Sequence, residues 1–171
     1  MIFILTGPVH SGKSSFLKQL VEWLKQRKVR VRGFLTKPVL FNDKRLGYDL
    51  IDLISGHKVP FLRSIEKPGR ELGFGFAFVP EGLRTAVESI NQVVEGELLV
   101  VDEVGPAELK GEGLWPALEK VLNRVDCLLV VRESLLSQVS GLLGRQEIEV
   151  FRIEKGQKLE TIGASIKKNL K

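Results

Sequence analysis

The chain has 171 residues, of which 43% are hydrophobic and 27% charged, and its formal net charge at pH 7 is +5. This composition predicts one globular domain over residues 1–171, and the single cysteine, Cys127, excludes an intrachain disulfide and a thiolate metal site. No apolar run approaches the ~18 residues of a membrane span and no basic segment precedes the first apolar run, so we expect a cytoplasmic protein without a membrane partner. The basic excess suits a polyphosphate ligand, but Lys and Arg are spread along the chain, so nucleic acid is not indicated.

The chain begins with a short apolar run, Ile2 to Leu5, which predicts a buried strand. The next stretch, Gly7-Pro-Val-His-Ser-Gly-Lys-Ser14, matches the phosphate-loop pattern G-x-x-x-x-G-K-[ST] at every fixed position. Apolar residues from Phe16 to Leu24 then follow at the spacing of one helix face and predict a helix that ends near Arg27. Strand, glycine loop and helix in this order are the context that the motif requires, and they disfavour a glycine turn of purely structural purpose.

The chemistry of this loop suits a nucleoside triphosphate. Gly7 and Gly12 allow the backbone to curve, so that successive N–H groups face phosphate oxygens at the positive end of a helix dipole. Lys13 is expected to contact the β- and γ-phosphates, and the Ser14 hydroxyl is expected to bind Mg²⁺. The predicted nucleotide-binding residues are Gly7, Pro8, Val9, His10, Ser11, Gly12, Lys13, Ser14 and Ser15.

Two extended segments follow the first helix. Alternating residues predict a strand from Val29 to Phe41, and a second strand from Leu46 to Ile54 follows the turn Asn42-Asp-Lys44. These strands predict a β-hairpin over about residues 29–54, an insertion that a minimal parallel α/β unit does not need.

A loop is predicted for residues 59–73, which contain two prolines, two glycines and three basic side chains. Phe74, Phe76 and Phe78 then alternate with small residues, which indicates one face of a strand against the core. A stacking surface for a base is the less favoured interpretation of the three rings.

The second half of the chain alternates helices with short apolar strands. Helices are predicted over residues 81–95, 114–125, 134–143 and 159–170, and strands over 98–101, 127–131 and 148–153. This alternation is typical of a three-layer α/β fold, a mostly parallel sheet with helices on both faces. The carboxyl ends of the strands then place Gly7, Asp102 and Arg132 at one edge of the sheet, where ligands of such folds bind.

The strand Leu98-Leu-Val-Val101 ends in two carboxylates, Asp102 and Glu103. An apolar strand ending in Asp is the Walker B pattern, and we expect Asp102 to hold Mg²⁺ through water. Glu103 is expected to orient or deprotonate the attacking water as a catalytic residue. Arg132 is expected to stabilise γ-phosphate charge, although an ordinary surface arginine remains the alternative. Glu108 fits a surface carboxylate better than a ligand.

Four stretches carry a resemblance to a known family: Gly7–Ser14, Arg32–Thr36, Arg45–Asp49 and Asp102–Leu109. They resemble the small P-loop nucleoside-triphosphatases related to the thermophilic and cancer-related nucleoside-triphosphatases. The resemblance implies a RecA-like fold and slow, Mg²⁺-dependent hydrolysis of ATP, GTP and other nucleoside triphosphates to diphosphate and phosphate. It assigns phosphate and metal roles to Lys13 and Ser14, and metal and water-activating roles to Asp102 and Glu103. The chain departs from the family at Lys37, where an acidic residue is common.

The sequence therefore favours a nucleoside-triphosphatase of broad base specificity. One alternative is a P-loop kinase for a nucleotide or small metabolite, with the basic segment Arg63–Arg70 as a lid. Another is a nucleotide-dependent switch or binding module with incidental turnover. The sequence has no Asn-Lys-x-Asp guanine reader, which disfavours strict GTP specificity.

Overall fold

The computed structural model describes residues 1–8, 11–42, 44–65, 75–144, 146–154 and 156–170. Their strands form one eight-stranded sheet in the order β5-β4-β3-β2-β6-β7-β1-β8. The strands are β1 (Ile2–Thr6), β2 (Val31–Phe41), β3 (Lys44–Asp52), β4 (Lys58–Ser64), β5 (Phe76–Phe78), β6 (Leu98–Val104), β7 (Asp126–Val131) and β8 (Ile148–Arg152). The helices are α1 (Lys13–Gln26), α2 (Pro80–Asn91), α3 (Pro106–Leu109), α4 (Trp115–Val121), α5 (Leu136–Leu143) and α6 (Leu159–Asn169), with a 3₁₀ turn, η1 (Glu133–Leu135).

The central part of the sheet is parallel, from β2 through β6, β7 and β1 to β8. Every residue of β1 and β7 is buried, which explains the apolar runs at residues 2–5 and 127–131, because a parallel strand is covered on both faces. The predicted three-layer α/β fold is confirmed. Within the described part of the chain, no helix has the length and apolar content to cross a membrane.

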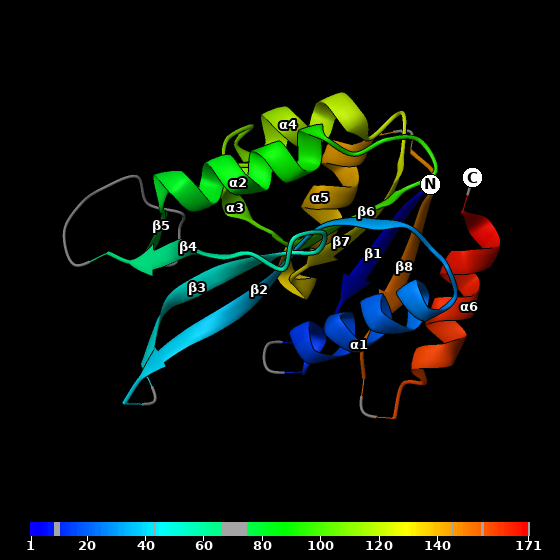
Figure 1. Cartoon of the computed structure of the whole chain (residues 1–171), viewed down its shortest axis with the longest axis horizontal. Helices are drawn as coiled ribbons and strands as arrows, with labels where there is room; N and C mark the ends of the chain where they lie inside the picture. The colour runs from blue at the N-terminus through cyan, green and yellow to red at the C-terminus, as the bar shows by residue number, and fades with distance from the viewer. Residues whose placement is uncertain (9–10, 43, 66–74, 145, 155, 171) are drawn as a thin grey trace.

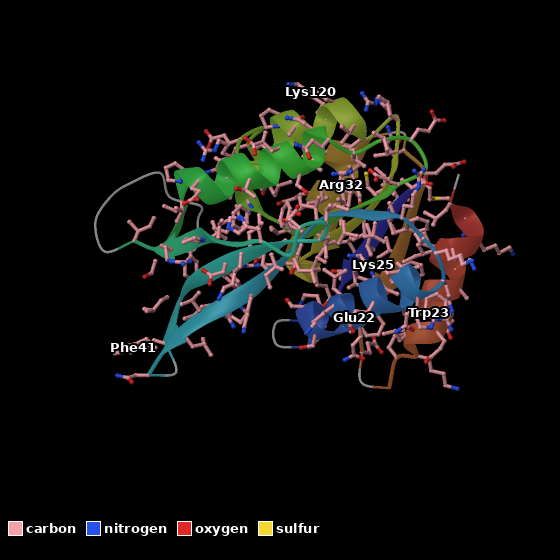
Figure 2. All side chains as sticks on the ribbon, viewed as in Figure 1. Glu22, Trp23, Lys25, Arg32, Phe41 and Lys120 are labelled. Atoms are coloured by element: carbon pink, nitrogen blue, oxygen red, sulfur yellow. The ribbon has the colours of Figure 1, made fainter. Side chains whose placement is uncertain are left out.

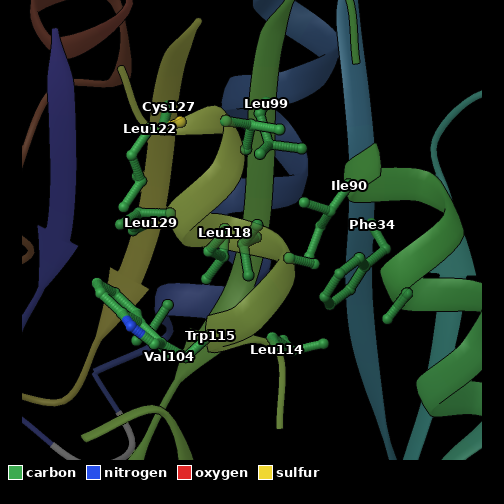
Figure 3. Packing of buried hydrophobic residues seen from close by; sticks show 14 of the residues in the cluster. Phe34, Ile90, Leu99, Val104, Leu114, Trp115, Leu118, Leu122, Cys127 and Leu129 are labelled. Atoms are coloured by element: carbon green, nitrogen blue, oxygen red, sulfur yellow. The ribbon is translucent and has the colours of Figure 1, made fainter. Parts of the chain in front are cut away.

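Helices cover both faces of the sheet, with α2, α4 and α5 on one side and α1 and α6 on the other (Figure 1). On the first face, Trp115 and Leu118 of α4 pack over β6 and β7, where Cys127 is fully buried (Figure 3). Burial raises the pKa of the Cys127 thiol to about 12, as expected for an unreactive core residue. Helices packed on both faces therefore hold the parallel strands β6, β7 and β1 in place, and the carboxyl ends of these strands lie at one edge of the sheet.

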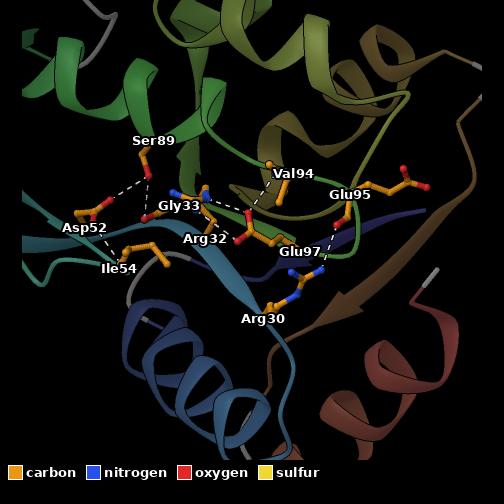
Figure 4. Close-up of polar contacts among 9 residues, drawn as sticks. All are labelled: Arg30, Arg32, Gly33, Asp52, Ile54, Ser89, Val94, Glu95 and Glu97. Carbon is orange, nitrogen blue, oxygen red and sulfur yellow. Dashed lines mark hydrogen bonds and ion pairs between the residues drawn. The ribbon is translucent and has the colours of Figure 1, made fainter.

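The predicted β-hairpin is formed by β2 and β3, and antiparallel β4 and β5 extend the sheet beyond it. Its tip projects away from the helices, where Phe41 is 64% exposed (Figure 2). Polar contacts fix the base of the hairpin: Arg32 Nε donates to Glu97 at 2.8 Å, and Ser89 Oγ donates to Asp52 at 2.9 Å (Figure 4). The assignment of residues 1–171 to a single domain stays a prediction.

The loop predicted for residues 59–73 is wrong over its first part, because β4 covers Lys58–Ser64. Val59 and Phe61 are buried, and β4 pairs with β3, so tertiary pairing overrides the proline at position 60. The remainder of this segment, residues 66–73, and Phe74 lie outside the described residues. Phe76 and Phe78 pack against the core, as predicted.

Helix boundaries in the second half also differ from the prediction. Helix α2 ends at Asn91, and the helix predicted for residues 114–125 is restricted to α4 (Trp115–Val121). Ser134 was expected to begin a helix, but it lies inside the 3₁₀ turn η1. Periodicity alone predicts the buried face of a helix better than its ends, because terminal turns depend on their tertiary contacts.

Candidate active site

The phosphate loop lies between β1 and α1. Gly12 precedes the helix with a φ of 81°, in the left-handed region that favours glycine. A Cβ on Gly7 would lie 2.8 Å from the Ile153 carbonyl oxygen, so the chain passes too close to the end of β8 for a side chain. Val9 and His10, predicted in the loop, lie outside the described residues.

Lys13 is folded back over its own loop. Its Nζ donates to the carbonyl oxygens of Gly7 at 2.9 Å and Pro8 at 2.6 Å. Burial lowers the pKa of Lys13, and the charge of Arg132 lowers it further, whereas Glu103 opposes the shift. The Lys13 ammonium group therefore lies against the loop carbonyls and is influenced by the charges of Glu103 and Arg132.

Asp102, near the end of β6, is 2% exposed. Its Oδ2 accepts hydrogen bonds from the Thr36 backbone N at 2.8 Å and the Thr36 hydroxyl at 2.9 Å. Burial raises the pKa of Asp102 to about 6, although both Thr36 bonds oppose the shift. Both of these bonds go to Oδ2.

Glu103 has a φ of 80°, a left-handed conformation that is unfavourable for a residue with a side chain. The pairing of β6 with β7 shifts register between Val101 and Val104, so Glu103 lies in an irregularity of the sheet. Its Oε1 accepts a 2.9 Å hydrogen bond from Arg132 Nε and a second one from Nη2 of the same guanidinium. The strained backbone directs the carboxylate toward the end of β7.

One cavity of about 300 Å³ joins these groups. Its lining residues are Ser11, Gly12, Lys13, Ser14, Ser15, Pro38, Arg45, Tyr48, Asp102, Glu103, Val130 and Arg132. The phosphate-loop residues Lys13 and Ser14 thus lie on the same cavity as Asp102, Glu103 and Arg132, which the sequence placed at one sheet edge. Gly7 and Pro8 are not lining residues, and their carbonyls hold the lysine instead.

Three lining residues, Pro38, Arg45 and Tyr48, come from the β2–β3 hairpin and were not predicted as site residues. The available signal was the stretch Arg45–Asp49, one of those that carried the family resemblance. The spacing of apolar residues did not reveal a role for this stretch, because the sequence of a partly exposed hairpin strand does not indicate which cavity the strand borders.

The prediction of a surface position for Glu108 is wrong, since this residue is 3% exposed. Its two carboxylate oxygens accept hydrogen bonds from the backbone N of Gly105 at 2.8 Å and of Leu114 at 3.0 Å. Burial raises the pKa of Glu108, while these bonds oppose the shift. Glu108 therefore holds the chain that follows Glu103 in place across α3.

The donor set fits a magnesium ion. Ser14 and Asp102 place a hydroxyl and a carboxylate on one cavity, and hard oxygen donors of this kind suit Mg²⁺ bound together with substrate phosphates. Among the described residues no cluster of three or more His, Cys, Asp or Glu side chains forms a metal site.

A glycine loop at a helix start and a carboxylate pair on the same cavity define a P-loop nucleotide-binding protein of the three-layer α/β class. The chain belongs to the NTPase family, whose sequence model matches residues 2–164. It is 30% identical to nucleoside-triphosphatase THEP1 of Methanothermobacter thermautotrophicus over 157 residues, which cover 90% of this chain and 87% of that protein. It is 29% identical to the Thermofilum pendens THEP1 over 155 residues, 88% of this chain and 85% of that protein.

The fold is shared with solved structures. A human cancer-related nucleoside triphosphatase superposes with a TM-score of 0.77 at 23% identity, covering 99% of this chain and 98% of that chain. THEP1 from Aquifex aeolicus superposes with a TM-score of 0.74 at 18% identity, covering 100% and 99%. These likenesses confirm the predicted fold.

Proposed function

We propose that this protein is a Mg²⁺-dependent nucleoside-triphosphatase that hydrolyses ATP, GTP and other nucleoside triphosphates to the diphosphate and phosphate. The observation that carries the proposal is the shared cavity, where Lys13 and Ser14 lie together with Asp102 and Glu103. The relatives named nucleoside-triphosphatase THEP1 support the same activity. Broad base specificity is consistent with the missing guanine-reading motif.

In this proposal Lys13 and the N-terminus of α1 bind the phosphates. Ser14 and Asp102 would hold Mg²⁺, which would supply positive charge to the triphosphate. Lys13 exchanges its contacts with the loop carbonyls for phosphate oxygens, which compensate the ammonium better than neutral carbonyls do.

Glu103 acts as the general base. It accepts a proton from the attacking water as the new O–P bond forms and the bond between the γ-phosphorus and the bridging oxygen breaks. Arg132, which pairs with Glu103 in the structure, is positioned to turn part of its guanidinium toward the γ-phosphate. The diphosphate and inorganic phosphate then leave the cavity.

A second candidate function, the kinase, is favoured by one observation. A smaller pocket of about 40 Å³ lies against the same Glu103 and Arg132 and is lined by Tyr48, Phe76 and Phe78. This pocket has room for only a few water molecules, so an acceptor could reach Glu103 from that side only if the pocket opened. The predicted lid gains no support from Arg63, which lies in β4 and forms an ion pair with Asp49 at 2.5 Å.

The test measures phosphate release from ATP, GTP, CTP and UTP with Mg²⁺. It compares the wild type with Glu103→Gln and with the control Glu119→Gln, which changes an exposed carboxylate of α4. We expect release from all four nucleotides, its loss in Glu103→Gln with nucleotide binding retained, and wild-type rates in the control. Absence of wild-type hydrolysis would overturn the proposed function. Diphosphate formation that becomes large only when an acceptor is added, with the phosphoryl group recovered on that acceptor and not as free phosphate, would favour the kinase.

A further inference from the structure

We propose that Arg45 of β3 binds the γ-phosphate of the nucleotide and that Tyr48 positions its guanidinium. The proposal rests on the proposed function, because it takes the 300 Å³ cavity as the triphosphate site. It adds a phosphate-binding cation that the hairpin contributes to a cavity also lined by the phosphate loop.

The first argument is the register of the hairpin. Arg45 and Tyr48 are three positions apart, so on a regular strand their side chains would point to opposite faces. The pairing skips Leu46, because Tyr48 lies opposite Pro38 whereas Arg45 lies opposite Leu40. This bulge returns Arg45 to the face of Pro38 and Tyr48, and all three line the cavity.

The second argument is the way in which Arg45 is held. Its Nη1 donates to the Tyr48 hydroxyl at 2.9 Å, and the guanidinium carbon lies 5.4 Å from the centre of the Tyr48 ring. The tyrosine is itself 9% exposed, so it is a fixed support. A neutral hydroxyl orients the guanidinium without neutralising it, and the positive charge is available to an anion.

The third argument locates Arg45 at the γ end of the cavity. Glu103, which we assign to water activation, must lie near the γ-phosphate, and Tyr48 lines both this cavity and the 40 Å³ pocket together with Glu103. Burial raises the pKa of Tyr48, the Glu103 charge raises it further, and Arg45 and Arg132 oppose the shift. The shared lining places Tyr48 near Glu103, and Arg45, which bonds to Tyr48, therefore lies near the base that activates the attacking water.

The charge of the cavity agrees with this assignment. Its lining carries two carboxylates, Asp102 and Glu103, which repel a polyphosphate and which Lys13 and Arg132 only balance. Arg45 adds a third cation to the lining, from the hairpin. A guanidinium there can donate in parallel to two oxygens of a terminal phosphate, a geometry that lysine does not provide.

The experiment compares binding of ADP and of the non-hydrolysable triphosphate analogue AMPPNP, each with Mg²⁺, by calorimetry. The variants are Arg45→Met, Arg45→Lys, Tyr48→Phe and the control Lys37→Met, an exposed cation on the same hairpin outside the cavity lining. We expect Arg45→Met to weaken AMPPNP binding about tenfold and ADP binding less than twofold, as for loss of one charge-assisted contact to the terminal phosphate. Arg45→Lys should lie between, and Lys37→Met should match the wild type.

The role of Tyr48 is tested by non-additivity. Tyr48→Phe should weaken AMPPNP binding about threefold without changing ADP binding, and Arg45→Met with Tyr48→Phe should be no weaker than Arg45→Met alone. Thermal unfolding of each variant identifies a general loss of stability. Equal losses for ADP and AMPPNP, or no change in Arg45→Met, would overturn the proposal. Because these readouts are binding constants, they are independent of hydrolysis, whose absence in the wild type would instead overturn the proposed function.

Discussion

Thr36 and Asp102 lie 66 positions apart in the chain, yet the backbone N and the hydroxyl of Thr36 both donate to Oδ2 of Asp102, at 2.8 and 2.9 Å. The contact arises because β2 and β6 are parallel neighbours whose last paired residues are Phe34 and Val101. The hairpin insertion is therefore joined directly to the carboxylate that we assign to Mg²⁺.

Thr36→Val should weaken this connection. The variant keeps the backbone hydrogen bond and nearly the same shape but loses the hydroxyl bond to a buried carboxylate, a loss of about 1–3 kcal/mol. We expect a lower free energy of unfolding at pH 7 in urea and a higher Mg²⁺ concentration for half-maximal phosphate release. Thr36→Ser retains the hydroxyl and should remain near the wild type, so equal behaviour of the two variants would contradict the assignment.

The pKa of Asp102 predicts a pH dependence of stability. The folded value is about 6, raised from 3.8 by burial. A raised carboxyl pKa adds stability that is fully present below pH 4 and is lost as the pH rises through 6, by about 3 kcal/mol in all. Urea unfolding of the wild type and Asp102→Asn from pH 4 to 7.5 should show this loss only in the wild type. Parallel curves for the two proteins would rule it out.

The left-handed backbone at Glu103 predicts a difference between two substitutions that remove the same carboxylate. Glu103→Ala keeps a Cβ at a φ of 80°, whereas Glu103→Gly relieves the strain. We expect the glycine variant to be more stable than the alanine variant by about 1 kcal/mol in urea unfolding, with phosphate release lost in both. An alanine variant as stable as the glycine variant would show that this conformation stores no strain.

The close approach at Gly7 predicts that Gly7→Ala is destabilising, because the new Cβ would meet the Ile153 carbonyl oxygen at 2.8 Å and its φ is 154°. We expect a loss of about 1–3 kcal/mol together with weaker nucleotide binding. The matched control is Gly141→Ala in α5, where nothing lies within 4 Å of the added Cβ. That variant should gain up to about 1 kcal/mol, as alanine is the better helix former. Similar unfolding curves for both variants would be inconsistent with the described packing.

Much of the site was predictable because its signals are local. The phosphate loop is a contiguous motif, and Asp102 and Glu103 follow directly from a continuous apolar strand. Parallel strands place their carboxyl ends together, so the sequence also predicted that Arg132 would share an edge with them. The family resemblance added the expected activity.

Other features depend on contacts between segments distant in the chain. The sequence did not show that β4 would form despite its proline, that Glu108 would be buried by bonds to Gly105 and Leu114, or that a bulge would turn Arg45 toward the cavity. Side-chain spacing specifies the buried face of an element, and by itself it determined the α/β class and the phosphate loop. Register and partners follow from which strands become neighbours, so only the tertiary structure decided the Thr36–Asp102 contact and the wall that the hairpin contributes.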